Sequence, residues 1–255
     1  SRARIGRRST GRVAGTSTPS PRATSVPELT DLPPAARRWL DRVLPAGTDA
    51  PTHVAISQRG SLESNGRWLD FRSEGTYQAS PLAFEWRARL SIMFGLWAIA
   101  TDGHAGGEGW GGAKLWGVKS IGGRTGPEVQ AMQLIRNLAE LAWLPDMAAV
   151  DPSLRWQAAG ADAFELTAQA ADRPVIVRFD LDEAGDVVRA SSPARPIDVP
   201  DGFEDIPWHY DFGAHRSVGG VRVPTSAVAT YDEPDDPWEY FRAEVTDIER
   251  FYREA

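Results

Sequence analysis

The side chains best suited to proton transfer lie in one short glycine-rich segment, residues 102–108. His104 and Glu108 have the residue types of an acid and a base, since imidazole titrates near neutral pH and a carboxylate accepts protons. Glu85, on a preceding predicted strand, is a third candidate. Proton transfer on a bound substrate would follow if these side chains faced one cavity. The alternative interpretation of the same segment is a solvent-exposed turn without a catalytic role.

Tryptophan provides the second chemical signal, because the chain has ten. Four of them on predicted strands are the candidate ligand-binding residues: Trp86, Trp97, Trp116 and Trp208. Indole rings that line a partly open barrel would bind a flat or long apolar molecule, because ligand pockets are mostly apolar with few polar groups. Core packing is the alternative role, since each tryptophan buries a large area.

Composition excludes several classes of function. The chain has no cysteine, which rules out disulfides, thiol catalysis and cysteine–metal sites. Its net charge is −7, although the first 25 residues hold six arginines and no acidic residue. The remainder is therefore strongly acidic, and we expect no nucleic-acid binding because affinity for phosphate backbones comes mainly from Lys and Arg. Residues 1–30 are predicted to be a disordered basic tail and residues 31–255 a single β-rich domain.

Motifs for common cofactors are missing. No phosphate-binding glycine loop and no nucleophile elbow is present in the sequence. We therefore expect no cofactor, and no histidine or carboxylate spacing predicts a metal site. The longest apolar run, residues 90–100, is too short to span a membrane. No apolar segment follows the N-terminal arginines, so a cytoplasmic location is expected; an exported or processed form stays open because the chain begins with Ser.

Most of the chain shows the two-residue period of β-strands. The clearest case is 84–94, where apolar residues such as Phe84 and Trp86 alternate with charged ones such as Glu85 and Arg87. Successive strand residues face opposite sides, so one face of this strand is predicted to be buried. Asp102-Gly103 has the composition of a hairpin turn. Residues 238–252 fit either a helix or a strand.

Two helices are predicted. A short one is opened by Pro33 and Pro34 and runs to Leu44, and a long one spans 127–144. On the long helix Arg136 and Glu140 are four residues apart, which favours an ion pair on its surface. The whole pattern predicts a mainly β (α+β) fold, a large curved antiparallel sheet or half-barrel of about eleven strands. The long helix is inserted near the middle and is expected to bury its apolar stripe against the sheet.

The motifs together resemble an uncharacterised bacterial family. Its pattern combines Gln-x-Gly, Phe-x-Trp-x-Ala, Gly-x-Gly and Arg-x-x-x-Glu. This sequence has Gln58 with Gly60, Phe84 to Ala88, Gly107 to Gly109, and Arg136 with Glu140. The order of elements is also similar to half-barrel lipoprotein carriers of the LolA and LppX type. That similarity implies a hydrophobic cavity for acyl chains between a curved sheet and helices.

Three functions fit these observations. The first is binding of a hydrophobic small molecule, lipid or acyl chain in a tryptophan-lined half-barrel cavity. The second is a cofactor-independent cyclase or isomerase that uses the same cavity with His104, Glu108 or Glu85. The third is a scaffold with a basic tail and no cavity. A titratable group that points into an apolar cavity would favour the enzyme.

Overall fold

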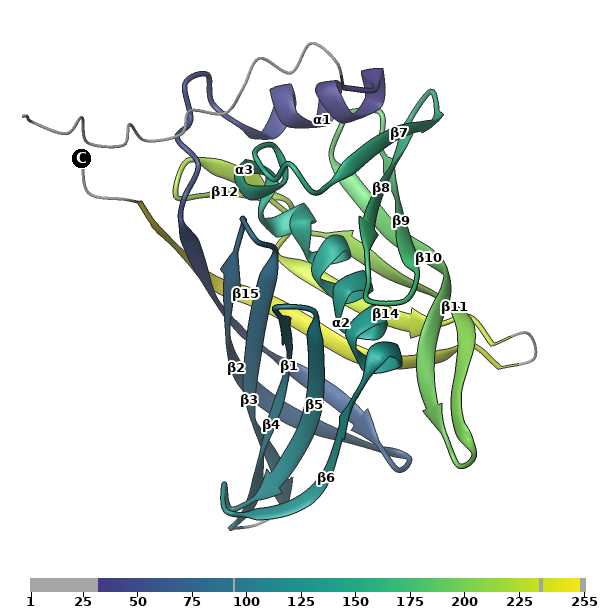
Figure 1. The fold of residues 1–255 in the computed structure, drawn as a ribbon. Coiled ribbons are helices and arrows are strands. Elements are labelled where there is room, and N and C mark those ends of the chain that lie inside the picture. The colour runs from purple at the N-terminus through teal and green to yellow at the C-terminus, as the bar shows by residue number, and fades with distance from the viewer. Residues whose placement is uncertain (1–31, 94, 234–235, 253–255) are drawn as a thin grey trace, which may run out of the picture.

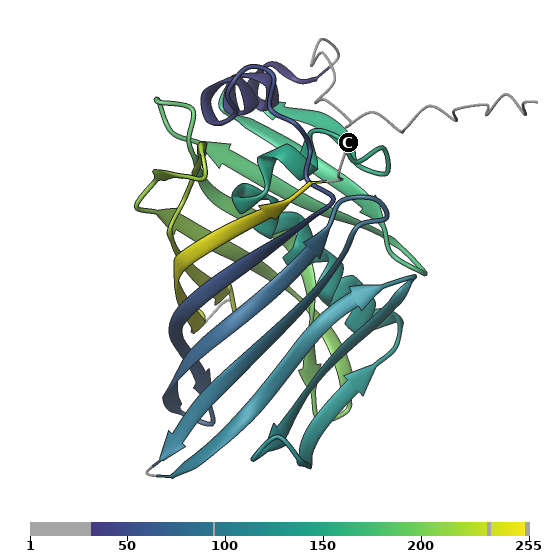
Figure 2. The same cartoon turned by 90° about the vertical axis from the view of Figure 1, so that its left-hand side faces the viewer.

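The computed structural model describes residues 32–93, 95–233 and 236–252. The predicted disordered tail, residues 1–30, lies outside these ranges. Thirteen strands form one antiparallel sheet that curls into a half-barrel (Figures 1 and 2). From one edge to the other the strands are β6 (Lys119–Thr125), β5 (Glu108–Leu115), β4 (Leu96–Ala105), β3 (Ala83–Met93), β2 (Arg67–Gln78), β1 (His53–Ser64), β15 (Trp238–Phe251), β14 (Ser226–Tyr231), β11 (Gly202–Gly213), β10 (Val187–Val199), β9 (Pro174–Leu181), β8 (Ala163–Gln169) and β7 (Arg155–Gly160).

The two halves of the sheet are joined by the last strand. β15 pairs with β1 on one side and with β14 on the other, so the C-terminal strand lies in the middle of the sheet. This pairing settles the ambiguous segment 238–252 as a strand. A separate small sheet is formed by β12 (Arg216–Val218) and β13 (Val221–Val223).

Helix α2 (Pro127–Glu140) lies against the inner face of the curled sheet (Figure 1). It packs between β4 and β5 on one side and β9 and β10 on the other. A 3₁₀ turn, η1 (Leu141–Trp143), and the short α3 (Pro145–Ala148) follow it. The predicted long helix therefore exists, and its last residues take the tighter 3₁₀ form before Pro145, which lacks the N–H that a continuing helix needs.

The short helix α1 (Pro34–Val43) covers one end of the half-barrel. Its apolar face is buried, and Trp39 stacks on Phe164 and Phe179 with ring centroids 5.4 and 6.2 Å apart. β3 shows the predicted alternation, with Phe84, Trp86 and the residues that follow them at every second position turned to the core. The predicted mainly β half-barrel with one inserted helix and a short N-terminal helix is thus confirmed, with thirteen strands in the sheet where about eleven were expected.

Two local predictions were wrong. Asp102-Gly103 is not a hairpin turn but lies within β4, and the chain turns at Gly106 and Gly107, whose φ angles are +59° and +85°. Position 103 has no room for a larger residue, because a Cβ there would lie 2.5 Å from the ring of Trp110. The second error concerns α2, where the Arg136–Glu140 pair was predicted on the surface but is buried.

Candidate functional site

Motifs far apart in the sequence meet at one point under α2. The side-chain amide oxygen of Gln58 accepts a hydrogen bond from the indole N–H of Trp86 at 3.2 Å. The guanidinium of Arg136 lies over the rings of Trp86 and Phe84, at 4.8 and 5.3 Å from their centroids. Gly109 lets β5 approach the helix, since a Cβ there would lie 2.3 Å from the backbone of Gln130. Phe84, Trp86 and Gly109 therefore lie directly against α2, and Gln58 joins them through Trp86.

Glu140 is the centre of a buried polar network. Its carboxylate is fully buried and accepts hydrogen bonds from Arg136 Nε at 2.7 Å, from the Tyr77 hydroxyl at 2.7 Å and from the Tyr210 hydroxyl at 3.3 Å. Arg136 also donates from Nη1 to Asp102 at 3.1 Å. Burial and the neighbouring Glu140 charge raise the pKa of both tyrosines well above its usual range. The tyrosines therefore remain neutral donors, and the carboxylate is held between three groups that favour its charge.

A cavity of about 390 Å³ lies between this network and the sheet. Its walls include aromatic side chains from distant strands, among them Trp86, Tyr210 and Phe241, and the apolar Val129 and Met132 of α2. The wall made by β5 and β6 carries almost no side chains, because it consists mostly of glycine and alanine at 111–113 and 122–123. Space therefore remains where larger residues would have closed the half-barrel.

The chain also matches a known protein family. The profile of a family of unknown function, DUF6544, matches residues 22–243. The chain belongs to the DUF6544 family. No curated relative matches the sequence.

Three solved structures with a similar fold share about a tenth of their residues with this DUF6544 chain. A LolA superfamily protein from Nitrosomonas europaea is 10% identical over 87% of this chain and 93% of its own, with a TM-score of 0.42. A putative outer membrane lipoprotein-sorting protein domain from Vibrio parahaemolyticus is 9% identical over 85% of this chain and 90% of its own, with the same TM-score. A DUF1329 family protein from Desulfovibrio piger is 10% identical, covers 85% and 90%, and has a TM-score of 0.40.

The four candidate tryptophans of the DUF6544 chain are not brought together. Trp86 borders the cavity. Trp208 is fully buried behind the cavity wall and donates a hydrogen bond to the hydroxyl of Tyr240, which does border the cavity, at 3.0 Å. Trp97 lies on β4 under the guanidinium of Arg89, 4.5 Å away, and is not part of the cavity wall. Trp116 is 51% exposed in the turn between β5 and β6.

None of the three candidate acid–base residues borders the aromatic cavity; His104 and Glu85 border a separate open pocket of about 610 Å³ at one end of β3 and β4, and Glu108 is not part of its wall. His104 is buried and contacts the side-chain nitrogen of Asn137 through Nε2 at 2.9 Å, and burial lowers its pKa to about 4. Glu85 is exposed on the opposite face of the sheet, because it is the neighbour of the buried Phe84 on β3. Glu108 is exposed at the first position of β5. The titratable groups that border the aromatic cavity include Asp102 and Arg136. Neither was among the acid–base candidates predicted from the sequence.

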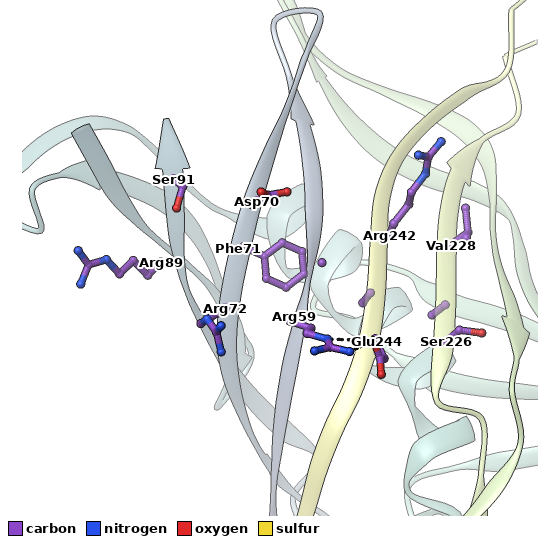
Figure 3. A pocket seen from close by; sticks show the side chains of 13 residues that line it. Arg59, Asp70, Phe71, Arg72, Arg89, Ser91, Ser226, Val228, Arg242 and Glu244 are labelled. Carbon is purple, nitrogen blue, oxygen red and sulfur yellow. Dashed lines mark hydrogen bonds and ion pairs between the residues drawn. The ribbon is translucent and has the colours of Figure 1, made fainter. Parts of the chain in front are cut away.

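A larger and more open groove, of about 940 Å³, crosses the outer face of the sheet (Figure 3). Its side chains come from β1, β2, β3, β14 and β15, and several are arginines. Arg59 pairs with Glu244 across the groove at 2.6 Å, and both are about half exposed. Arg72 lies directly between Arg59 and Arg89 in the strand register. The groove is a charged surface depression, in contrast to the aromatic cavity under α2.

Within the described part of the chain, no helix is long and apolar enough to cross a membrane. No group of three or more histidine or carboxylate side chains is placed to hold a metal ion in that part either.

Proposed function

We propose that the half-barrel binds a hydrophobic small molecule or acyl chain in the cavity between α2 and the sheet. The observation that carries the proposal is the composition of the cavity wall: Trp86, Tyr210 and Phe241 face it from distant strands, and its volume is about 390 Å³. Ligand sites of small molecules are concave, mostly apolar and supplied with a few fixed polar groups, and this cavity has each property.

The part of the cavity wall formed by β5 and β6 supports the proposal. Gly122 of β6 pairs with Ala113, which in turn pairs with Ala100 of β4, and all three border the cavity. Paired residues of neighbouring strands face the same side of the sheet, so a side chain at position 122 would enter the cavity. Nothing lies within 4 Å of a Cβ built at Gly122. The space is accessible to a ligand atom for the same reason.

Native mass spectrometry of the protein purified gently from its own host is the first test, followed by denaturation and identification of any released compound. We expect a co-purifying apolar compound, and we expect the G122W variant to lose it because the indole fills the cavity. S120W is the matched control, since Ser120 lies on the same strand, is exposed and does not border the cavity. A clean unliganded mass, with no heat of binding for medium-chain alcohols or acids in calorimetry, would reject the proposal.

A second candidate function is a cofactor-independent isomerase or cyclase. Asp102 favours it, because its carboxylate borders the cavity and burial raises its pKa. A carboxyl group with a raised pKa is suited to acid–base work. Incubating the identified compound with the protein discriminates the two functions: a carrier returns it unchanged, whereas an enzyme yields an isomer and the D102N variant does not.

A further inference from the structure

Arg195 is a buried cation in the cavity wall that the sequence reasoning did not single out. It lies on β10, where the register with β11 shifts between Ser192 and Arg195. The bulge turns its side chain toward α2, and the residue is only 5% exposed. Its Nε donates to the backbone oxygen of Met132 at 3.3 Å. Arg195 therefore spans from the sheet to the helix along the border of the cavity.

All the contacts of this guanidinium are with neutral groups. Nη1 donates to the hydroxyl of Tyr231 and, at 3.4 Å, to that of Tyr240. The ring of Trp208 lies 4.8 Å and that of Tyr231 5.2 Å from its central carbon. Burial raises the pKa of Tyr231, so this phenol remains neutral. Among residues 32–93, 95–233 and 236–252, no carboxylate lies within ion-pair distance of Arg195 and no partner is present for Nη2.

Two other arginines with buried side chains in the described part of the chain differ from Arg195 in this respect. Arg136 has the carboxylate of Glu140 at 2.7 Å, and Arg250 has that of Asp146 at 2.6 Å. A buried charge is unfavourable unless it is paired, and aromatic faces offset only part of that cost. Both of these arginines follow that rule within the protein, whereas Arg195 does not.

The charged groups near Arg195 do not neutralise its buried positive charge. Asp102 borders the same cavity, and burial raises the pKa of its carboxyl against the charges of Arg136 and Arg195. Its Oδ2 accepts from Arg136, and no hydrogen bond joins it to Arg195. Arg136 itself is close enough to act on Arg195 as a like charge. The Nη2 of Arg136 is buried without a partner in the described residues, and Arg136 borders the cavity. Arg124 and Asp198 also border the cavity, but they pair with each other at 2.8 Å. Two guanidinium groups with unused donors, those of Arg136 and Arg195, thus flank the aromatic part of the cavity.

We propose that the ligand is an anionic amphiphile whose carboxylate or phosphate group is bound by Arg195, with its apolar chain against Trp86 and Phe241. This inference rests on the proposed function and adds the chemistry of the ligand's polar end. A carboxylate or phosphate accepts two hydrogen bonds from a guanidinium, and such charge-assisted bonds are the strongest available to Arg. The anion would also screen Arg136 from Arg195.

Calorimetric titration with four decyl compounds tests the inference: decanoate, decyl phosphate, decanol and decyltrimethylammonium. We expect the wild-type protein to bind one or both anions more tightly than decanol by about tenfold to a hundredfold, the range for hydrogen bonds to a charged group. The comparison of decanoate with decyl phosphate separates the two anionic head groups. R195M should lose this preference, so that its affinities for the two anions fall to about its affinity for decanol, and R195K should retain part of it.

R189M is the matched control, because Arg189 lies on the same strand but pairs with Asp211 at the surface. It should bind every compound as the wild type does. Wild-type affinity for decanoate and for decyl phosphate that is no tighter than for decanol would overturn the inference while leaving the proposed function intact. Failure of all four compounds to bind would reject the proposed function itself. The head-group comparison needs only the wild-type protein, so it decides the question even if R195M does not fold.

Discussion

Replacing Glu140 by Gln is the sharpest test of how α2 is held in the sheet. The substitution keeps the size of the side chain and removes its charge, and it puts an N–H₂ group where three donors now converge. Arg136 would remain buried with only Asp102 as a carboxylate partner. Removing one partner of a buried ion pair costs about 3–5 kcal/mol of stability, mostly from the charge left behind.

The expected loss is large enough to measure in two ways. For a chain of this length, ~1 kcal/mol shifts the melting temperature by about 2–4 °C, so E140Q should melt roughly 6–20 °C below the wild type. Urea unfolding followed by tryptophan fluorescence gives the free energy directly. E244Q is the matched control, since the Arg59–Glu244 pair is about half exposed and its loss should cost less than about 1 kcal/mol.

A double variant separates charge from packing. R136M/E140L replaces the buried pair with apolar side chains of similar size, and such replacements are often close to neutral. It should be more stable than E140Q, although Tyr77 and Tyr210 lose their acceptor. If E140Q were as stable as E244Q, the reasoning that Glu140 neutralises a buried arginine would be refuted.

Two further predictions concern residues around α2. G109A should lose about 1–3 kcal/mol in urea unfolding because its Cβ would lie 2.3 Å from the backbone of Gln130, whereas G122A should not, since nothing lies near that position. The pKa of His104 is about 4 in the fold, below its usual 6.5, so the unfolded chain binds more protons between these values. The contribution of His104 to stability should therefore fall as pH drops from 6.5 and level off below 4, by ~3 kcal/mol in total. H104Q should flatten this part of the pH profile, and an unchanged profile would show that His104 is not its source.

The sequence predicted the parts of the fold in which one face of an element is buried. β3 was recognised because Phe84 and Trp86 point inward while Glu85 and Arg87 point outward, and this alternation appears directly in the residue order. The segment 238–252 was ambiguous because its apolar residues fit both periods. Only its pairing with the preceding strand β14 and with β1, which is remote in the sequence, decides it.

The site was harder to predict because it depends on what covers each residue. The spacing of Arg136 and Glu140 indicates that they pair, but not that β2 and β11 bury the pair. No sequence pattern indicated a role for Arg195, because the direction of its side chain depends on a bulge in β10. The tryptophans indicated an aromatic interior, yet only the strand register separates Trp86 at the cavity from Trp97 on the outer face. Part of the cavity exists through the absence of side chains on β5 and β6, which no motif reports.

In the proposed binding mode, one arginine serves the stability of the fold and another serves ligand recognition. Glu140 neutralises Arg136 within the protein, so this pair serves mainly to fix α2, and a ligand adds little to a charge already balanced. Arg195 has only neutral partners, so the gain from a bound anion is greatest there. Substitutions at 140 should therefore lower the melting temperature of the unliganded protein, whereas R195M should chiefly reduce the rise in melting temperature that decanoate produces. That rise follows from ligand binding to the folded state alone, which makes the two effects separable in one thermal unfolding experiment.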